Sequence, residues 1–356
     1  MTGPYRESSL PRRIAIAYTL LVIYASLHPF SGWRDLGVPP FAYLDAAWPR
    51  YYTGFDLASN VVGYLPLGFL WAATFQARLP RAVALVLTLC LGMLLSLGME
   101  TIQNYLPSRV SSNVDLGCNT LGTLLGSIAG VIWGRALLSG GRLHQLRNTW
   151  IIPGRSGDTG LVLLALWLLT QLNPETLLLG SGDLRHLLGL EQAMNFDAEH
   201  FRRIETVVAG VNGLATGLVM SAVLRQRRPA TILTLFFAAL SIRALAYALL
   251  VSPAEAFHWI TPGNELGLAL GLALLLPCLW LPPVLRRVLA AMALLFATVV
   301  VNLAPENPYL KQATQVWRQG HFLNFNGLTR LASVLWPFLA LCWLMLKEKT
   351  WQTSKP

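Results

Sequence analysis

The sequence predicts an all-α, polytopic integral membrane protein with about ten transmembrane helices. Of its 356 residues, 54% are hydrophobic and only 12% are charged, whereas soluble domains have about 25% charged residues. The hydrophobic residues occur in blocks of about 20, the length of helix that crosses a hydrocarbon core of about 30 Å. The blocks lack the strict alternation of apolar and polar residues that is typical of a membrane β-barrel. The apolar side chains are therefore expected to face lipid.

Short turns separate neighbouring spans and combine a proline with basic residues, as at Arg78–Arg81 and Arg225–Pro229. Proline stops a helix, and arginine anchors its end at the membrane surface. An even number of spans places both termini on one side of the membrane. The expected spans cover residues 11–29, 57–76, 81–104, 115–138, 159–180, 205–224, 230–251, 264–281, 284–303 and 329–346.

The distribution of basic residues predicts the orientation of the chain. With the N-terminus inside, the inner segments contain roughly twice as many Lys and Arg residues as the outer segments, as cytoplasmic loops do. The chain is thus predicted to lie in an inner (plasma) membrane with both termini cytoplasmic. This asymmetry accounts for the net charge of +10, which gives no support to nucleic-acid binding. The four cysteines lack metal-ligand spacing, and no metal or cofactor is expected.

Two of the expected spans begin with the same pattern, Asp-Leu-x-x-Asn-x-x-Gly, at Asp56 and at Asp115. A later span begins with Asn264-x-x-Gly267, which is similar. A parallel four-helix repeat explains these recurrences, and so does chance, because small residues at this spacing are common where membrane helices pack. In the repeat, Ile260 would match Asp115 and Ala209 would match Asn60. The repeat divides the chain into a four-helix membrane unit (1–140), a second four-helix unit (141–283) and two further helices with a cytoplasmic tail (284–356).

Polar side chains are expected to gather at the outer ends of spans two to four. Asp56 and Asn60 are four residues apart and therefore lie on the same face of a helix. Asp115 and Asn119 have the same spacing. Ionisable groups at membrane depth are unfavourable unless they are paired or hydrated, so they are candidates for a functional site. The predicted binding site comprises Asp56, Asn60, Glu100, Gln103, Arg109, Asp115 and Asn119.

Arg109, in the short loop after the third span, is the expected cation for the three acids of this site. Two alternatives remain for the acids themselves. Asp56 and Asp115 could be helix N-caps, and Glu100 could extend towards the head groups from a helix end. Capping does not require an amide one turn further into the helix, and its presence twice favours a site.

The order of these residues resembles the VanZ-like family over roughly residues 15–140, about a third of the chain. The resemblance implies a membrane protein of the bacterial cell envelope and, through the family's namesake, a connection with resistance to the glycopeptide teicoplanin. It transfers no catalytic role to any residue. The residues that carry it are Asp56, Asn60, Pro66-Leu67-Gly68, Glu100, Gln103, Pro107, Arg109, Asp115, Asn119 and Gly122.

Three functions fit these features. The first is a polar site near the outer leaflet that binds or moves an amphiphile, such as a lipid-linked cell-envelope precursor, with membrane lipid as its surroundings. The second is an intramembrane enzyme acting on a lipid phosphate or pyrophosphate, with carboxylates that hold a divalent cation. The third is a structural partner in an envelope complex. Whether the protein is an enzyme stays open.

Three further features lie outside the resemblance. Arg243, within a later span, is expected to pair with an acid such as Glu100 or to reach water. Glu205 matches Asp56 in the repeat, or else balances the charges of Arg202 and Arg203. The amide-rich segment 304–328 is expected to form an interfacial helix, a lid or a hairpin at the level of the head groups.

Overall fold

The computed structural model describes residues 10–48, 54–139, 142–189, 195–305, 307–308 and 323–346. Throughout these ranges the regular elements are helices, as the sequence predicts, and eight of them are long and apolar enough to cross a membrane. The chain divides into two compact units, Met1–Thr149 and Trp150–Pro356. The expected third part, residues 284–356, lies within the second unit.

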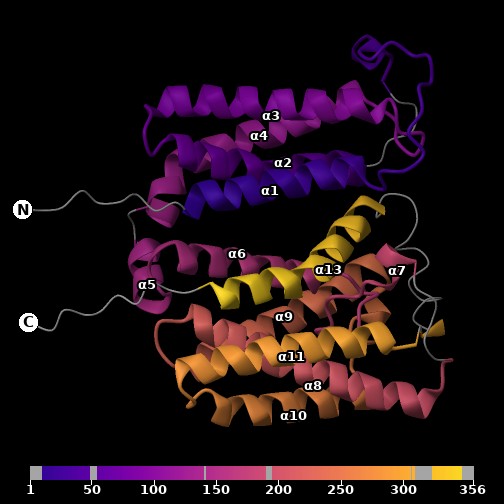
Figure 1. The fold of residues 1–356 in the computed structure, drawn as a ribbon. Coiled ribbons are helices and arrows are strands. Elements are labelled where there is room, and N and C mark those ends of the chain that lie inside the picture. Colours follow the sequence, from indigo (N-terminus) through magenta and orange to yellow (C-terminus); the bar gives the residue numbers. More distant parts are fainter. Residues whose placement is uncertain are drawn as a thin grey trace, which may run out of the picture. The chain divides into compact units, whose positions relative to one another are not determined.

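The first unit is a bundle of four long helices (Figure 1). α1 and α3 end where α2 and α4 begin, and we call this the site end of the unit. The elements of the unit are α1 (Leu10–Leu27), a 3-10 turn at Ala42–Leu44, α2 (Gly54–Phe75), α3 (Arg81–Gln103), α4 (Asn113–Gly134), a π-helical turn at Arg135–Ser139 and α5 (Arg142–Trp150).

α2 and α4 run parallel and pack through a row of glycines on α4. A Cβ atom at Gly122 would lie 2.2 Å from the carbonyl oxygen of Val61, and one at Gly126 would lie 2.0 Å from that of Leu65. Gly130 meets the carbonyl of Phe69 in the same way. Glycines four residues apart lie on one helix face and let two backbones approach closely in a membrane. This contact fixes how α2 and α4 present their polar side chains at the site end.

The connection from α1 to α2 folds back over the site end. The side chain of Asn104 donates a 2.6 Å hydrogen bond to the carbonyl of Pro40, and Asn113 donates one of 2.8 Å to the carbonyl of Ala46. Beneath this connection, Leu27 at the end of α1 packs with buried Met99 and Leu106. Asn104 and Asn113 therefore attach the described part of this connection to the site end.

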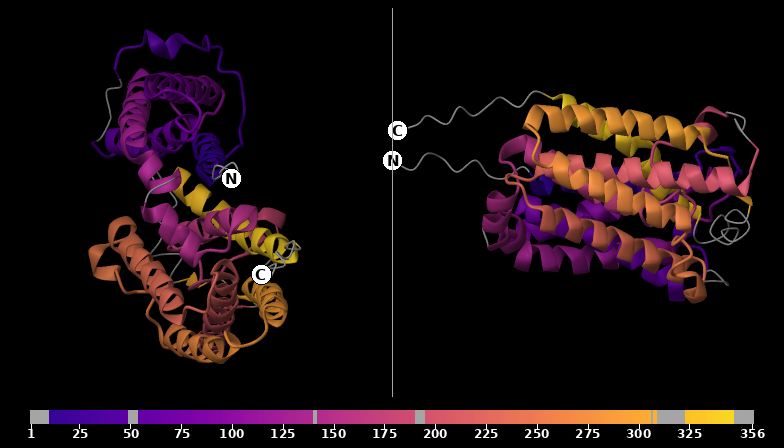
Figure 2. Two further views of the ribbon diagram at one scale, coloured as in Figure 1. Left: turned by 90° about the vertical axis from the view of Figure 1, so that its left-hand side faces the viewer. Right: turned by 90° about the horizontal axis from the view of Figure 1, so that it is seen from below.

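The second unit has a large hydrophobic core around α8, which packs against α9, α10 and α11 (Figure 2). Trp167 and Trp336 are each 1% exposed, and the indole of Trp336 donates a 2.9 Å hydrogen bond to the carbonyl of Leu163. The helices of this unit are α6 (Gly154–Thr170), α7 (Arg185–Leu188), α8 (Ala198–Val223), α9 (Pro229–Leu250), α10 (Pro262–Cys278), α11 (Pro283–Leu303) and α13 (Leu323–Met345), with a 3-10 turn at Pro253–Glu255.

All ten expected spans coincide with helices, but α6 and α10 have only 17 residues each. The expected span 159–180 is too long, because α6 ends at Thr170. Proline at position 174 cannot continue a helix and disfavours helical geometry in the residue before it. The chain from 171 to 184 is instead largely buried without being helical. Such backbone is stable at membrane depth only where protein or water satisfies its polar groups.

Arg243 of α9 donates hydrogen bonds to backbone carbonyls of this segment. The side chain is 2% exposed, and its guanidinium donates to the carbonyl of Asn173 at 2.8 Å, to the hydroxyl of Thr176 at 2.9 Å and to the carbonyl of Thr176. The expected acidic partner is thus replaced by backbone carbonyls and a hydroxyl, and Glu100 belongs to the other unit. Arg243 is a structural residue that holds the turn after α6.

The α8–α10 contact repeats the α2–α4 contact. Gly267 meets the carbonyl of Thr206, and Gly271 meets that of Gly210, as Gly122 and Gly126 meet Val61 and Leu65. For the first helix of each pair, α2 and α8, this alignment is shifted by one helical turn from the expected one. Glu205, and not Ala209, occupies the position of Asn60. A repeat of complete four-helix units stays a prediction.

Candidate functional site

α2 and α4 are joined by a polar side-chain pair at the site end of the first unit. The amide nitrogen Nδ2 of Asn60 donates a 2.8 Å hydrogen bond to Oδ1 of Asp115. Both side chains are half-buried. The glycine row of α4 brings the two helices close enough for these short side chains to meet. Asp56 lies in the first turn of α2, near enough to Asp115 for their charges to repel.

Glu100 approaches the same place from the last turn of α3. Its side chain is 4% exposed, and Oε2 accepts a 2.9 Å hydrogen bond from the backbone nitrogen of Ser112. Its charge also interacts with those of Asp115 and Arg109. A buried carboxylate requires such donors because burial removes its hydration. Glu100 is therefore a fixed part of the site and does not extend towards the head groups.

Ser112 is the N-cap of α4. Its hydroxyl oxygen accepts hydrogen bonds from the backbone nitrogens of Val114 at 3.1 Å and Asp115 at 3.3 Å. Since Ser112 fills the capping position, Asp115 is not the N-cap and its carboxylate is free to serve another purpose. The sequence Ser-x-x-Asp before an apolar run is a recognisable capping pattern, so the role of Ser112 could have been predicted.

Arg109 and Gln103 secure the end of α1. Nη2 of Arg109 donates a 2.7 Å hydrogen bond to the carbonyl of His28, and Nε2 of Gln103 donates one of 2.8 Å to the carbonyl of Ser26. Burial lowers the pKa of Arg109 to about 10, and the charge of Glu100 acts in the opposite direction. The guanidinium therefore stays charged at neutral pH. The Arg109 guanidinium donates to backbone carbonyls, and Glu100 interacts with it at longer range.

Several buried polar atoms at the site end have no hydrogen-bond partner among the described residues. Nδ2 of Asn119 donates to the hydroxyl of Ser96 at 2.9 Å, whereas its Oδ1 is unpartnered. Nε of Arg109 is also unpartnered. The hydroxyl of Tyr64 lies close to Ser96 and Glu100. Buried polar groups are almost always satisfied, so the unpartnered atoms indicate a place for water or a ligand.

Tyr64 and Ser96 were not predicted as site residues. Tyr64 lies four residues after Asn60 and Ser96 four residues before Glu100, so both share a helix face with a predicted residue. Their hydroxyls could have been found by extending each polar face by one turn. Position in the helix alone does not distinguish them from ordinary packing residues.

The site has three acids, one arginine, two asparagines and two hydroxyl-bearing neighbours. This set can accept hydrogen bonds from hydroxyl, amide or ammonium groups, and Nε of Arg109 can donate one. Within the part of the chain that the structure describes, no group of three or more His, Cys, Asp or Glu residues is arranged to hold a metal ion.

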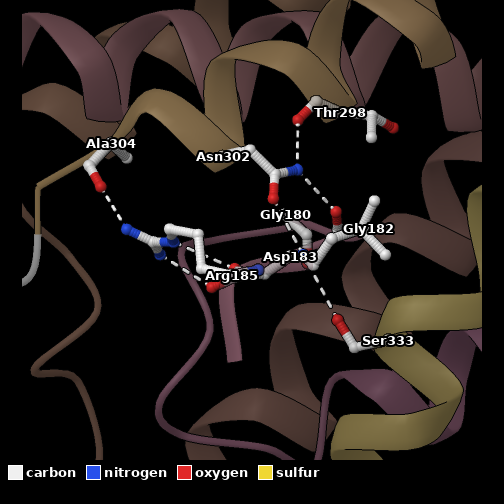
Figure 3. A network of polar contacts seen from close by, with 9 residues as sticks. Gly180, Gly182, Asp183, Arg185, Thr298, Asn302, Ala304 and Ser333 are labelled. Carbon is white, nitrogen blue, oxygen red and sulfur yellow. Dashed lines mark hydrogen bonds and ion pairs between the residues drawn. The ribbon is translucent and has the colours of Figure 1, made fainter. Parts of the chain in front are cut away.

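A second polar network, in the other unit, was not predicted (Figure 3). Asn302 of α11 donates to the carbonyl of Gly182 at 2.7 Å and accepts a 2.8 Å hydrogen bond from the backbone nitrogen of Leu184. Arg185 pairs with Asp183 at 2.7 Å and donates to the carbonyl of Ala304. These bonds hold the buried non-helical segment between α11 and α13 and have a structural role. Of the amide-rich segment 304–328, residues 306 and 309–322 lie outside the described residues.

Comparison with known proteins identifies a family for the N-terminal part only. Residues 4–134 match the sequence profile of the VanZ/LLP1 family. No curated protein and no solved structure shows significant similarity to the chain. The matched range includes α1 to α4 and every residue of the candidate site. The predicted resemblance is thus confirmed, and the N-terminal third of this membrane protein is a match to the VanZ/LLP1 family.

Proposed function

We propose that the first unit binds the polar part of an amphiphile, such as a lipid-linked cell-envelope precursor, and holds or moves it at the outer leaflet of the bacterial inner membrane. In this proposal both termini are cytoplasmic and the site end faces outwards. The observation that carries the proposal is the Asn60–Asp115 pair together with the unpartnered buried atoms of Asn119 and Arg109. These groups are suited to a polar ligand.

The apolar surface beside the site suits the rest of an amphiphile. Val62 on α2 is 64% exposed, and Leu121 and Leu125 on α4 are 47% and 45% exposed. These side chains lie on the two helices that carry Asn60 and Asp115. A head group at the site would thus have its acyl or prenyl chain next to lipid-facing helix surface, without leaving the hydrocarbon region.

The charge of the site limits the chemistry of the head group. The charged part of the site has three carboxyl groups and a single arginine, so hydroxyl, amide and ammonium groups are favoured over a bare phosphate. Arg109 can still supply one charge-assisted hydrogen bond to a phosphate oxygen through Nε. A precursor rich in sugar hydroxyls and peptide amides fits this balance.

Native mass spectrometry of the protein extracted from its own membrane tests the proposal. We expect a lipid-linked adduct on the parent protein, a smaller fraction of that adduct on Asp115→Asn, and no change on Asp35→Asn, an exposed acid in the same unit. Equal adducts on Asp115→Asn and the parent would contradict the proposal. Release of phosphate from the bound lipid would instead support the alternative, an enzyme acting on a lipid phosphate or pyrophosphate.

The family match provides a second readout in cells. If the site handles a precursor that glycopeptides recognise, deletion of the gene should change susceptibility to teicoplanin. Parent protein should restore the original susceptibility, and Asp115→Asn at equal abundance should not. Unchanged susceptibility on deletion would remove the glycopeptide link while leaving lipid binding to be judged by mass spectrometry.

A further inference from the structure

The repeated helix contact places a second polar pair in the second unit. In the α8–α10 register, Glu205 occupies the position of Asn60. The hydroxyl of Thr261, the N-cap of α10, donates a 3.0 Å hydrogen bond to Oε2 of Glu205. A Cβ atom at Gly263 would lie 3.0 Å from this same carboxylate oxygen. Glu205 is therefore held against the first turn of α10 by backbone packing as well as by the hydrogen bond.

Glu205 is a buried carboxylate with no cation beside it among the described residues. The residue is 9% exposed. The two nearby arginines, Arg202 and Arg203, form ion pairs with Glu199 at 2.9 and 3.3 Å instead. An ionised carboxylate without a countercharge is strongly unfavourable in an apolar environment. A cation bound from outside the described chain would supply the missing countercharge.

An amide oxygen in the first turn of α10 is unsatisfied. Asn264 is 4% exposed, and its Nδ2 donates to the carbonyl of Trp259 at 2.9 Å while Oδ1 has no partner in the described part of the chain. Asn264 shares a helix face with Gly267 and Gly271, which contact α8. Its backbone nitrogen bonds to the hydroxyl of Thr261 at 3.2 Å, so Thr261 links the two side chains.

Tyr247 of α9 also lies near enough to Glu205 for an electrostatic interaction. Its hydroxyl cannot satisfy the carboxylate, because it donates a 2.7 Å hydrogen bond to the carbonyl of Pro174. The acceptors that remain are the second oxygen of Glu205 and Oδ1 of Asn264. Carboxylate, amide and hydroxyl oxygens together are the usual ligands of hard cations.

We propose that Glu205, Thr261 and Asn264 form a binding site for a small monovalent cation. The cation is either an alkali-metal ion or the ammonium group of a lipid head group. Asn119 of the first unit occupies the position of Asn264 and also has an unpartnered Oδ1. The two helix pairs thus share a framework, but the second has one acid and no arginine at its centre and selects a lone positive charge.

The purified full-length protein in nanodiscs of phosphatidylglycerol alone tests the proposal. Its melting temperature is measured in sodium, potassium or N-methyl-D-glucamine chloride at equal ionic strength. A ligand that binds only the folded state stabilises it, so we expect sodium or potassium to raise the melting temperature by roughly 2–4 °C over N-methyl-D-glucamine. A rise that instead appears in all salts on adding phosphatidylethanolamine identifies the ammonium group as the source.

Variants assign the effect to the site. Glu205→Gln should abolish the rise, and Asn264→Ala should reduce it. Glu199→Gln, which removes an exposed acid from the same helix, and Asp115→Asn, which alters the first site, should retain it. Without a stabilising cation, Glu205→Gln should melt no lower than the parent, because it removes an unpaired buried charge. The absence of any rise in the parent, or an equal rise in Glu205→Gln, would overturn the proposal.

Discussion

Asn60 donates a 2.8 Å hydrogen bond to Asp115 across two helices that run parallel. Asn60 directly precedes Val61, whose carbonyl meets Gly122 of α4. The polar pair is therefore positioned by backbone contact and does not have to hold the helices together. This separation between packing and polar function makes the two properties testable by different substitutions.

Asp115→Asn should leave folding nearly unchanged and weaken ligand binding. An asparagine oxygen can still accept the hydrogen bond from Asn60, and hydrogen bonds between membrane helices average only about 0.6 kcal/mol. The charge, however, is lost from the site. Thermal unfolding of the purified variant should agree with that of the parent within about 1 kcal/mol. A variant that fails to fold would show that the carboxylate is structural.

Gly126→Ala should destabilise the first unit although alanine is the better helix former. The new Cβ atom would lie 2.0 Å from the carbonyl oxygen of Leu65, so α2 and α4 must separate. Overpacking of this kind costs about 1–3 kcal/mol. Gly117→Ala is the matched control on the same helix, because a Cβ atom there meets nothing within 4 Å.

At Gly117 the gain in helix propensity, up to about 1 kcal/mol, should dominate. The two variants are therefore expected to shift the unfolding free energy in opposite directions. Equal shifts, measured by thermal or denaturant unfolding in the same detergent, would mean that the glycine row does not form the α2–α4 contact.

Arg243→Met should destabilise the second unit. The substitution preserves much of the side-chain volume but leaves the buried carbonyl of Thr176 without this donor and removes one of the two donors to the carbonyl of Asn173. Unsatisfied buried acceptors cost about 1–3 kcal/mol each. Arg203→Met, at a side chain that is 72% exposed, should change the unfolding free energy by no more than about 0.5 kcal/mol. Similar melting temperatures for the two variants would contradict the structural role of Arg243.

The orientation of the chain can be tested with single cysteines. Val110 is 82% exposed in the loop after α3, and Phe257 is 66% exposed in the loop after α9. With both termini cytoplasmic, Val110→Cys and Phe257→Cys should react with an impermeant thiol reagent added to intact cells, and Arg227→Cys should react only after lysis. The parent protein, with its four cysteines, measures the background. Labelling of position 227 in intact cells would reverse the orientation.

Hydrophobic blocks and proline-containing turns were sufficient to predict the helices, because a membrane requires long apolar segments. The site acids could be predicted because charge is rare and costly at that depth. The end of α6 was placed too late, because Leu177–Leu179 resemble the continuation of a span. Pro174 and the polar residues around it stop the helix, and residues 171–184 follow as buried non-helical chain. Their burial depends on distant donors, Arg243 and Asn302, which only the fold brings to them.

The register of the repeat was wrong for the first helix of each pair, for a related reason. It aligned Glu205 with Asp56, acid with acid, whereas the glycine contacts align Glu205 with Asn60. In a membrane, the positions where two backbones approach closely determine which residues face each other, whatever the types of the neighbouring side chains. Glycine spacing was therefore the better guide to the alignment.

Arg109 supplies the last prediction, because it serves both the end of α1 and the charge of the site. Its Nη2 donates to the carbonyl of His28 at 2.7 Å, while Nε is unpartnered and Glu100 lies within electrostatic range. Arg109→Lys keeps the charge but cannot donate through a planar guanidinium in two directions. Arg109→Met removes both the charge and the hydrogen bond.

If the charge alone matters, Arg109→Lys should bind the amphiphile as the parent does and only Arg109→Met should fail. If the guanidinium also contacts the ligand, as we expect, both variants should lose most of the adduct, although Arg109→Lys should keep a melting temperature between those of the parent and Arg109→Met. Gln103→Ala serves as the control, because it removes only the hydrogen bond to Ser26 at the end of α1. Retention of the adduct in Gln103→Ala together with its loss in Arg109→Lys would separate ligand binding from the anchoring of α1, and loss in all three variants would assign Arg109 to anchoring alone.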